Sequence, residues 1–318
     1  MNFFQLLGLG YKNYFKGVRF LIEHKLYWFV LFPLILFAGI YWLGLYFQSV
    51  EARIADEISE NAQNIESIRG LTWITMKMLF FDSLHLIFTK FTLYIVVIIL
   101  SPVLSYLSER IENIIAGNKY KFNLKQLISD IKRGIKIAMR NLFWEYFFIV
   151  IILGIASFFG GFAKNIIIFS IPIMIGFYFY GFAFMDYINE RRRLNIQQSI
   201  YFVSKHRGLA IAIGSIYYIF FLSFFYVLRG YDKLPTDTGT QLLWGSILVI
   251  TFILAAIAPI LAITSATLSM HELVDLSKNE HAVRDEQALA NQNKELEEPD
   301  EIDEGSSENE ENKEDLDQ

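Results

Sequence analysis

Long apolar runs separated by short polar segments dominate the pattern of this chain. Each run holds roughly 20 mainly apolar residues, about the length of helix that crosses the hydrocarbon core of a bilayer. The six runs are Leu26–Phe47, Leu84–Leu107, Leu142–Phe159, Ile166–Tyr187, Gly208–Leu228 and Leu242–Leu268. The pattern predicts an all-α integral membrane protein with six apolar helical segments.

The third and fourth runs are separated only by Gly160–Asn165, and the third run is barely long enough to span. Two arrangements fit this spacing: two full crossings, or a tight hairpin that enters the bilayer and returns. The first run contains Pro33, which predicts a kink or break there because proline lacks the N–H that a helix interior needs.

Two further segments have amphipathic patterns. Residues 2–22 place aromatic and Leu residues near helical spacing, with Lys12, Lys16 and Arg19 between them, which predicts a helix in the membrane interface or packed on the protein. Residues 123–141 form the clearest amphipathic helix, predicted to lie on anionic lipid or under the bundle. Its apolar stripe consists of Leu124, Leu127, Ile128, Ile131 and Ile135.

The stretch Met185–Asn195, MDYINERRRLN, concentrates charge between two apolar runs. Consecutive arginines next to membrane spans indicate the cytoplasmic face. The acidic residues lie one helical turn apart, so we expect them to pair with the arginines and to tie the hairpin bases together. This predicted structural charge cluster consists of Asp186, Glu190, Arg191, Arg192 and Arg193.

The distribution of basic residues predicts the orientation of the chain. Segments 1–25, 108–141 and 188–207 carry 17 Lys and Arg in total, whereas the connections on the other side carry 6. Because cytoplasmic loops are enriched in Lys and Arg, both termini are predicted to be cytoplasmic. Re-entrant hairpins would leave this sidedness unchanged.

Charge also divides the chain into two regions. The net charge is −5, but residues 276–318 contribute −12 and the remainder +7. We therefore expect a helical membrane domain over residues 1–270 and an acidic, disordered cytoplasmic tail over residues 271–318.

Catalytic chemistry and cofactors are not indicated by any pattern. The chain has no cysteine, which excludes disulfides and thiolate sites. No nucleophile–base set, phosphate loop or metal cluster is evident. His271 and Glu272 begin like a zinc HExxH motif, but Asp275 occupies the second histidine position. We expect no enzyme, no cofactor and no metal, and the neighbouring spans argue against nucleic acid as a partner.

Three segments together resemble the CysZ-like or etoposide-induced-protein family of membrane proteins. They are GYKNYFKGVRFLIEHKLYWFVLFPLI, MDYINERRRLN followed by KHRGLAIAIGS, and APILAITSATL. The resemblance extends over about residues 1–270. It implies two long transmembrane helices with two helical hairpins that only partly penetrate the bilayer, over Leu142–Tyr187 and Gly208–Leu268. In the bacterial branch it also implies sulfate uptake, frequent oligomerisation and an inner-membrane location, whereas the eukaryotic branch is associated with endoplasmic-reticulum membranes.

The candidate anion site departs from that family's pattern. Sulfate-transporting members carry GLRRF before the early proline, whereas Tyr27 and Trp28 replace the paired arginines here. The nearby positive groups are His24 and Lys25. Lys90, inside the second apolar run, is a further candidate because ionisable groups within spans are often functional, although its long stem can also reach the interface.

Two hypotheses follow from these observations. The first is a permease or channel for sulfate or another small anion, with His24, Lys25 and Lys90 as substrate-binding candidates. The second is a non-transporting membrane scaffold that binds lipids or a protein partner through its basic surfaces. A homo-oligomer is compatible with either hypothesis.

Overall fold

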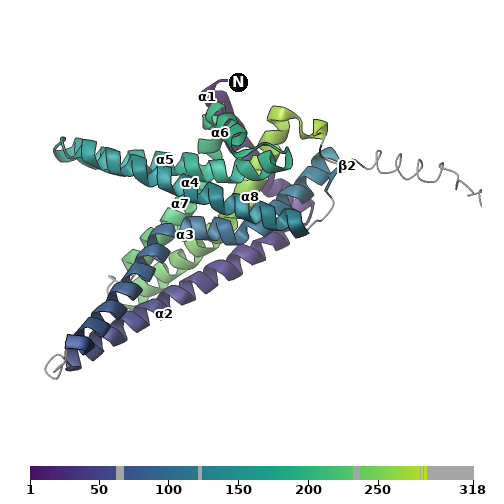
Figure 1. The fold of residues 1–318 in the computed structure, drawn as a ribbon. Helices are drawn as coiled ribbons and strands as arrows, with labels where there is room; N and C mark the ends of the chain where they lie inside the picture. Colours follow the sequence, from purple (N-terminus) through teal and green to yellow (C-terminus); the bar gives the residue numbers. More distant parts are fainter. Residues whose placement is uncertain (62–67, 121–123, 232–236, 280, 282, 285–318) are drawn as a thin grey trace, which may run out of the picture.

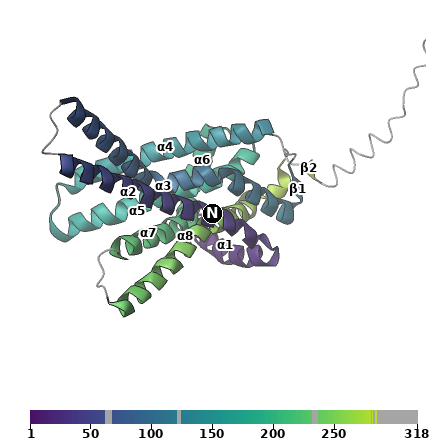
Figure 2. The same ribbon diagram turned by 90° about the horizontal axis from the view of Figure 1, so that it is seen from below.

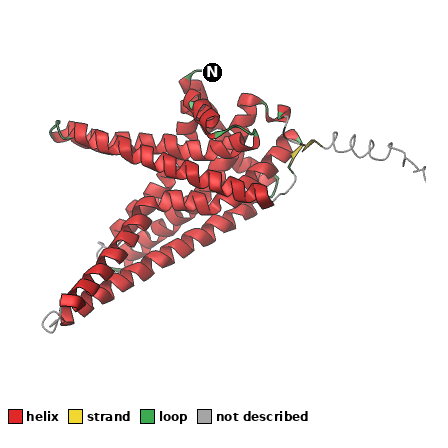
Figure 3. Ribbon diagram, in the orientation of Figure 1, coloured by secondary structure: helices red, strands yellow, loops and turns green. Residues whose placement is uncertain are grey.

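The computed structural model describes residues 1–61, 68–120, 124–231, 237–279, 281 and 283–284 of the 318-residue chain. Nearly all of them form helices (Figure 3). The long helices are α1 (Phe3–Glu23), α2 (Leu31–Asn61), α3 (Ile68–Ala116), α4 (Leu124–Ala156), α5 (Gly161–Arg191), α6 (Ile196–Lys205), α7 (Arg207–Tyr231) and α8 (Thr238–Val274). The short elements are 3-10 helices η1 (Leu26–Val30) and η2 (Leu276–Lys278) and strands β1 (Asn118–Lys119) and β2 (Val283–Arg284).

The prediction of an all-helical membrane protein with six apolar segments is confirmed. Within the described residues, six helical segments have the length and hydropathy needed to cross a membrane. They are Leu26–Gly44, Leu93–Ala116, Lys132–Ala156, Gly161–Arg191, Arg207–Gly230 and Thr238–Val274. The two-residue strands β1 and β2 form a single antiparallel pair outside these segments.

Three antiparallel helix pairs give the molecule its shape. The pairs α2/α3, α4/α5 and α7/α8 converge at one end, where β1 and β2 also lie (Figures 1 and 2). In Figure 1 the α4/α5 pair diverges from the other two pairs toward its far end. The described residues of segments 1–25, 108–141 and 188–207, to which the charge count assigned one side, lie at the convergent end, which we call the hub (Figures 1 and 2).

Local side-chain signals explain where several helices begin. Asn2 accepts a hydrogen bond from the backbone N–H of Gln5, and the Gln5 side chain bonds back to the Asn2 N–H, which forms a capping box at α1. Asn195 and Gln198 repeat this arrangement at α6. Asp237 caps α8 by accepting from the Thr240 N–H. Each cap satisfies N–H groups that lack intrahelical partners.

The structure corrects three local predictions. The break lies immediately before the first apolar run, at Lys25, which has a left-handed φ of 54°, and not at Pro33, which lies in the first turn of α2. The amphipathic segment 123–141 is not a separate helix, because it continues into the next apolar run as α4. The expected Gly160–Asn165 loop is shorter, because α5 already begins at Gly161.

The core is built mainly by α5, α7 and α8, with α1 packed across α7 and α8. Small residues permit close backbone approach between α5 and α7. A Cβ built on Gly181 would lie 1.7 Å from the Ala210 carbonyl oxygen, and one on Gly214 would lie 1.9 Å from the Phe177 carbonyl oxygen. These contacts fix α5 against α7 and thereby place the charged end of α5 in the hub.

Candidate functional site

Asp186, at the C-terminal part of α5, forms an ion pair with a helix that is distant in sequence. Its carboxylate accepts from Nη2 of Arg133 at 2.9 Å and from Nε at 3.2 Å. The Ser199 hydroxyl also donates to Asp186, and Arg133 donates to the Leu194 carbonyl. The bidentate guanidinium–carboxylate geometry joins α4, α5 and α6 with fixed orientation.

Arg191 forms a second buried ion pair one and a half turns further along α5. Its Nε lies 2.9 Å from Glu112 on α3, whose side chain is fully buried. Arg191 also donates to Ser108, which is hydrogen-bonded at 2.7 Å to Thr267 on α8. Since a buried charge is tolerated only when it is paired and hydrogen-bonded, this network fixes α3, α5 and α8 together.

The polar network extends from Glu112 to the β1–β2 segment. Glu112 accepts hydrogen bonds from Asn118, at 2.7 Å, and from the Tyr120 hydroxyl. Asn279 then donates to the Tyr120 oxygen at 3.0 Å and to the Arg191 carbonyl at 3.3 Å. Burial, reinforced by the nearby Glu112 carboxylate, raises the pKa of Tyr120.

The residues of the predicted charge cluster lie at the hub end of α5 and directly after it, and the partners of Asp186 and Arg191 differ from the expected ones. Asp186 pairs with Arg133 and Arg191 pairs with Glu112, so each charge reaches a different helix instead of a neighbour in the same stretch. Glu190 also approaches Arg133, at 3.8 Å. Local sequence spacing misses such pairs because their partners lie 53 and 79 residues away.

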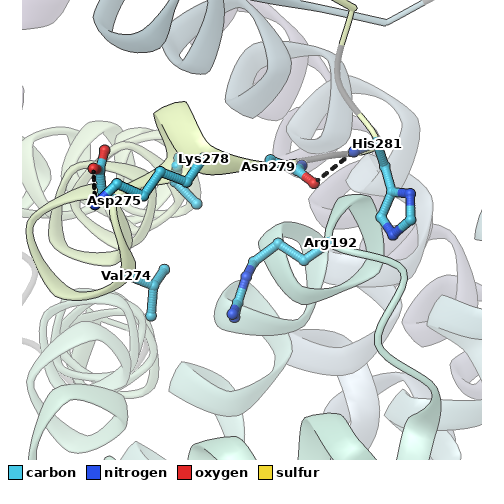
Figure 4. Close-up of a pocket in the computed structure, with 7 residues that line it drawn as sticks. Arg192, Val274, Asp275, Lys278, Asn279 and His281 are labelled. Carbon is cyan, nitrogen blue, oxygen red and sulfur yellow. Dashed lines mark hydrogen bonds and ion pairs between the residues drawn. The ribbon is translucent and has the colours of Figure 1, made fainter.

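The remaining two arginines lie at the end of α5. Arg193 is exposed and adopts a left-handed φ of 57°. Arg192 is half-buried, donates to the Asn189 side-chain oxygen at 3.3 Å and lies 5.1 Å above the Phe202 ring. Its side chain extends into an open cavity of about 190 Å³ beside the end of α8 (Figure 4). Burial lowers the pKa of Arg192.

His24 and Lys25 lie together at the corner between α1 and η1, and both side chains are exposed. The His24 ring packs 4.3 Å from the Phe20 ring. Tyr27 and Trp28 follow with 45% and 62% of their surface exposed, and their rings are in contact. The corner therefore combines one lysine, one histidine and two exposed aromatic side chains at the start of a helical segment.

Lys90 lies on α3, but its side chain is outside the described residues. The ring of Tyr106, further along α3, contacts Phe29 in η1. Lys90 precedes Tyr106 by 16 residues, which corresponds to about 24 Å of helix. His24 and Lys25 are therefore neighbours, whereas the role of Lys90 as a separate substrate-binding candidate stays a prediction.

Sequence reasoning missed a buried carboxyl group, Glu145, in the middle of the bundle. It is 4% exposed and accepts a hydrogen bond from the Tyr94 hydroxyl of α3. The Tyr94 ring packs 4.7 Å from Tyr180, which in turn stacks 5.4 Å from Tyr218. An acidic residue inside an apolar run was the available signal, but the tyrosines around it come from three other helices and only the fold brings them together.

Within the described residues, no group of three or more His, Cys, Asp or Glu side chains could hold a metal ion. His271 and Glu272 lie in the last turns of α8, where Glu272 pairs with Lys16 of α1 at 2.7 Å and with Lys12 at 3.4 Å. Glu272 thus serves as a contact between the first and last long helices.

Residues 13–228, which are 216 of the 318 residues, match the family model described as Sulfate transporter CysZ/Etoposide-induced protein 2.4. No curated protein matches the chain. The family consists of transporter-like membrane proteins rather than enzymes. The matched region includes the Lys25 corner and the whole MDYINERRRLN stretch. This chain therefore belongs to the CysZ/etoposide-induced protein 2.4 family of integral membrane proteins.

Proposed function

We propose that this protein moves a small anion, with sulfate as the first candidate, across the membrane in which it is embedded. The observation that supports this most directly is the family match, because the family's description names a sulfate transporter. The six apolar helices supply a membrane-embedded scaffold for such a task, and buried ion pairs at the hub join α3, α4 and α5 within it.

The corner between α1 and α2 is the best-supported place for the anion to bind. Lys25 introduces a left-handed break, after which the chain starts a new helical segment. The first N–H groups of a helix lack intrahelical partners and attract anions, and a nearby cation adds to this attraction. His24 and Lys25 provide that positive charge on an exposed surface.

The chemistry of this corner also limits the expected selectivity. Lysine is a point charge without the planar donor fork with which arginine grips a tetrahedral oxyanion. Tyr27 and Trp28, at the positions of the family's paired arginines, are largely exposed and supply aromatic surface instead. We therefore expect weak discrimination between sulfate and other small oxyanions.

Uptake of labelled sulfate into liposomes that contain the purified protein tests the proposal. We expect uptake above that of protein-free liposomes, and a several-fold reduction in Lys25→Ala. The matched control is Lys164→Ala, which removes an exposed lysine at the start of α5. A Lys90→Ala variant tests the second candidate separately. Sulfate uptake no higher than in protein-free liposomes would refute sulfate permeation.

A non-transporting scaffold is the second candidate. The observation that favours it is that Arg191, Asp186 and Arg133 are all consumed in helix-to-helix contacts, which stabilise the fold rather than contact a substrate. In this case the basic surfaces bind anionic lipid, a second copy or another protein. Wild-type-like folding and lipid binding without uptake of sulfate, phosphate or chloride would favour this function.

The location and orientation form part of the same proposal. The segments predicted to be cytoplasmic all lie at the hub. Because Lys and Arg are enriched on the cytoplasmic side of membrane proteins, we infer that the hub faces the cytoplasm. We place both termini in the cytoplasm and the protein in a bacterial inner membrane. The boundary between a membrane domain and an acidic tail near residue 271 also stays a proposal, since residues 285–318 are outside the described part of the chain.

A further inference from the structure

Two open cavities meet at Arg192 on the outer surface of the hub. The first, of about 190 Å³, lies between the α5 end and the segment that follows α8, and it includes Lys278 and His281 (Figure 4). The second, of about 490 Å³, lies along α6 and includes Lys205 and His206. Arg192 lines both cavities, and we call the two together the Arg192 groove.

Positive charge predominates in the Arg192 groove. Its lining contains three permanent cations, Arg192, Lys205 and Lys278, against a single carboxylate, Asp275. That carboxylate is already paired with Lys278 at 3.2 Å. Among the described residues, no carboxylate forms an ion pair with Arg192, whose contacts are an amide oxygen and an aromatic ring. An anionic ligand would therefore find an incompletely neutralised surface.

The groove also presents apolar and hydrogen-bonding groups. Leu194 and Phe202 line the α6 side, and Tyr201 is 65% exposed there. Gln197 and Gln198 add amide donors and acceptors. A combined volume several times that of a simple oxyanion, with apolar patches between the cations, suits an acidic peptide that carries isolated apolar side chains.

The chain itself contains such a peptide. Glu295–Glu304, ELEEPDEIDE, has seven acidic residues among ten, interrupted by Leu296 and Ile302. Residues 285–318 as a whole carry 15 Asp and Glu against 2 Lys. A second stretch of the tail, Glu308–Asp317, has six acidic residues among ten, but it also contains Lys313 and has Leu316 as its single apolar side chain.

The last described residues before the acidic tail lie beside the groove. His281 lines the first cavity, and β2 ends at Arg284, opposite Asn118. Ten residues separate Arg284 from Glu295, which allows a span of at most about 35–40 Å. A ligand tethered so closely has a high effective concentration, in the millimolar range for short flexible connections, so even weak charge-assisted contacts suffice for occupancy.

We propose that Glu295–Glu304 binds the Arg192 groove of the same chain, as an intramolecular acidic ligand that competes with other anions for Arg192. The contact requires no assumption about which side of the membrane is cytoplasmic, because the groove and the start of the tail lie at the same end of the molecule. It is also independent of the anion-transport proposal.

Distance measurement between two spin labels tests this contact in the full-length protein. The chain has no native cysteine, so Ser204→Cys on α6 and Ser306→Cys beyond the acidic segment give a unique label pair. In nanodiscs of zwitterionic lipid at low salt we expect a short, narrow distance distribution. In 1 M salt, where the Debye length falls to about 3 Å, we expect that population to be lost.

Matched variants separate groove binding from general attraction. Neutralising Arg192, Lys205 and Lys278 to Gln is expected to abolish the short population. Neutralising Arg110, Lys132 and Lys136 to Gln, which removes equal charge from exposed positions at the same end, is expected to leave it. Converting the seven acidic residues of Glu295–Glu304 to their amides is expected to abolish it without touching the folded domain.

Three results would overturn the proposal. The first is a broad distribution of the distance between the two labels at low salt, in protein with an unmodified groove. The second is an equal loss of the short-distance population in the groove variant (Arg192, Lys205 and Lys278 to Gln) and in the control variant (Arg110, Lys132 and Lys136 to Gln). That result would indicate non-specific attraction. The third is a short population that survives neutralisation of the acidic segment, which would place the tail by other contacts.

Discussion

At the scale of single residues, the ion pair between Arg191 and Glu112 is the contact whose loss should be most damaging. Replacing Arg191 by Met leaves a fully buried carboxylate without its cation. We expect a loss of about 3–5 kcal/mol in unfolding free energy. The measurement is thermal or denaturant unfolding in detergent micelles.

Two comparisons make this prediction specific. Adding Glu112→Gln to Arg191→Met removes the unpaired charge and should restore part of the stability. The exposed pair Arg19–Glu23, at 2.6 Å, provides a matched control, since ion pairs in contact with water contribute little to stability. Equal destabilisation by Arg19→Met and Arg191→Met would show that burial does not determine the contribution of Arg191.

A second residue-scale prediction concerns the hydroxyl that Tyr94 donates to Glu145. Tyr94→Phe leaves the buried carboxyl without this donor, and we expect a cost of about 1–3 kcal/mol in unfolding free energy. Tyr226→Phe, at a position 78% exposed, should change stability little. A double-mutant cycle with Glu145→Leu then measures the coupling. If Tyr94→Phe costs the same with and without Glu145, the hydrogen bond is not the source of the effect.

At the scale of secondary-structure elements, the crossing of α5 and α7 should depend on glycine. Gly181→Ala introduces a methyl group where the Ala210 backbone already lies, so α5 and α7 must separate. We expect a marked loss of thermal stability, although alanine is the better helix former by about 1 kcal/mol. Gly39→Ala on α2, where the added Cβ meets nothing within 4 Å, is the control and should be neutral or stabilising. An unchanged melting temperature in Gly181→Ala would contradict the close crossing.

The six apolar helices were largely predictable from the sequence, whereas the residues at which they begin and end were less predictable. Hydropathy identifies six apolar helices because each must satisfy its backbone groups internally within a bilayer. The break at Lys25 was not predictable, because Pro33 is the stronger local signal although proline is well tolerated in the first turn of a helix. The continuity of α4 was missed because its amphipathic and apolar halves read as separate patterns.

The candidate site was predictable to a smaller extent. That His24 and Lys25 lie close together was predictable, because the two residues are consecutive in the sequence. The partners of Asp186 and Arg191, and the tyrosines around Glu145, depend on contacts between helices that lie far apart in sequence. Periodicity identifies which residues are buried, but it carries no information on which buried residues meet.

At the scale of the whole molecule, the divergence of the α4/α5 pair from the other pairs bears on how the protein lies in the bilayer. Helices that diverge so widely are not all perpendicular to one membrane plane (Figure 1). The tip of this pair is apolar: Phe158 is 90% exposed and Phe162 is 81% exposed. The connection from α7 to α8, by contrast, has the polar sequence DKLPTD, residues 232–237.

These tips should therefore differ in their access to water. Because exposed phenylalanine is strongly favoured in an apolar environment, we predict that the α4/α5 tip ends within the bilayer while the α7/α8 tip reaches an aqueous face. Single cysteines at Ser157 and Thr238, both exposed in the structure, allow a direct comparison in a protein without native cysteine. Thr238→Cys should react with a membrane-impermeant maleimide from one side of sealed vesicles. Ser157→Cys should remain unreactive with reagent on either side, and should react only after solubilisation in detergent. Labelling of Ser157→Cys in intact vesicles would show that α4 and α5 cross the membrane completely, and both helix pairs would then be ordinary spans.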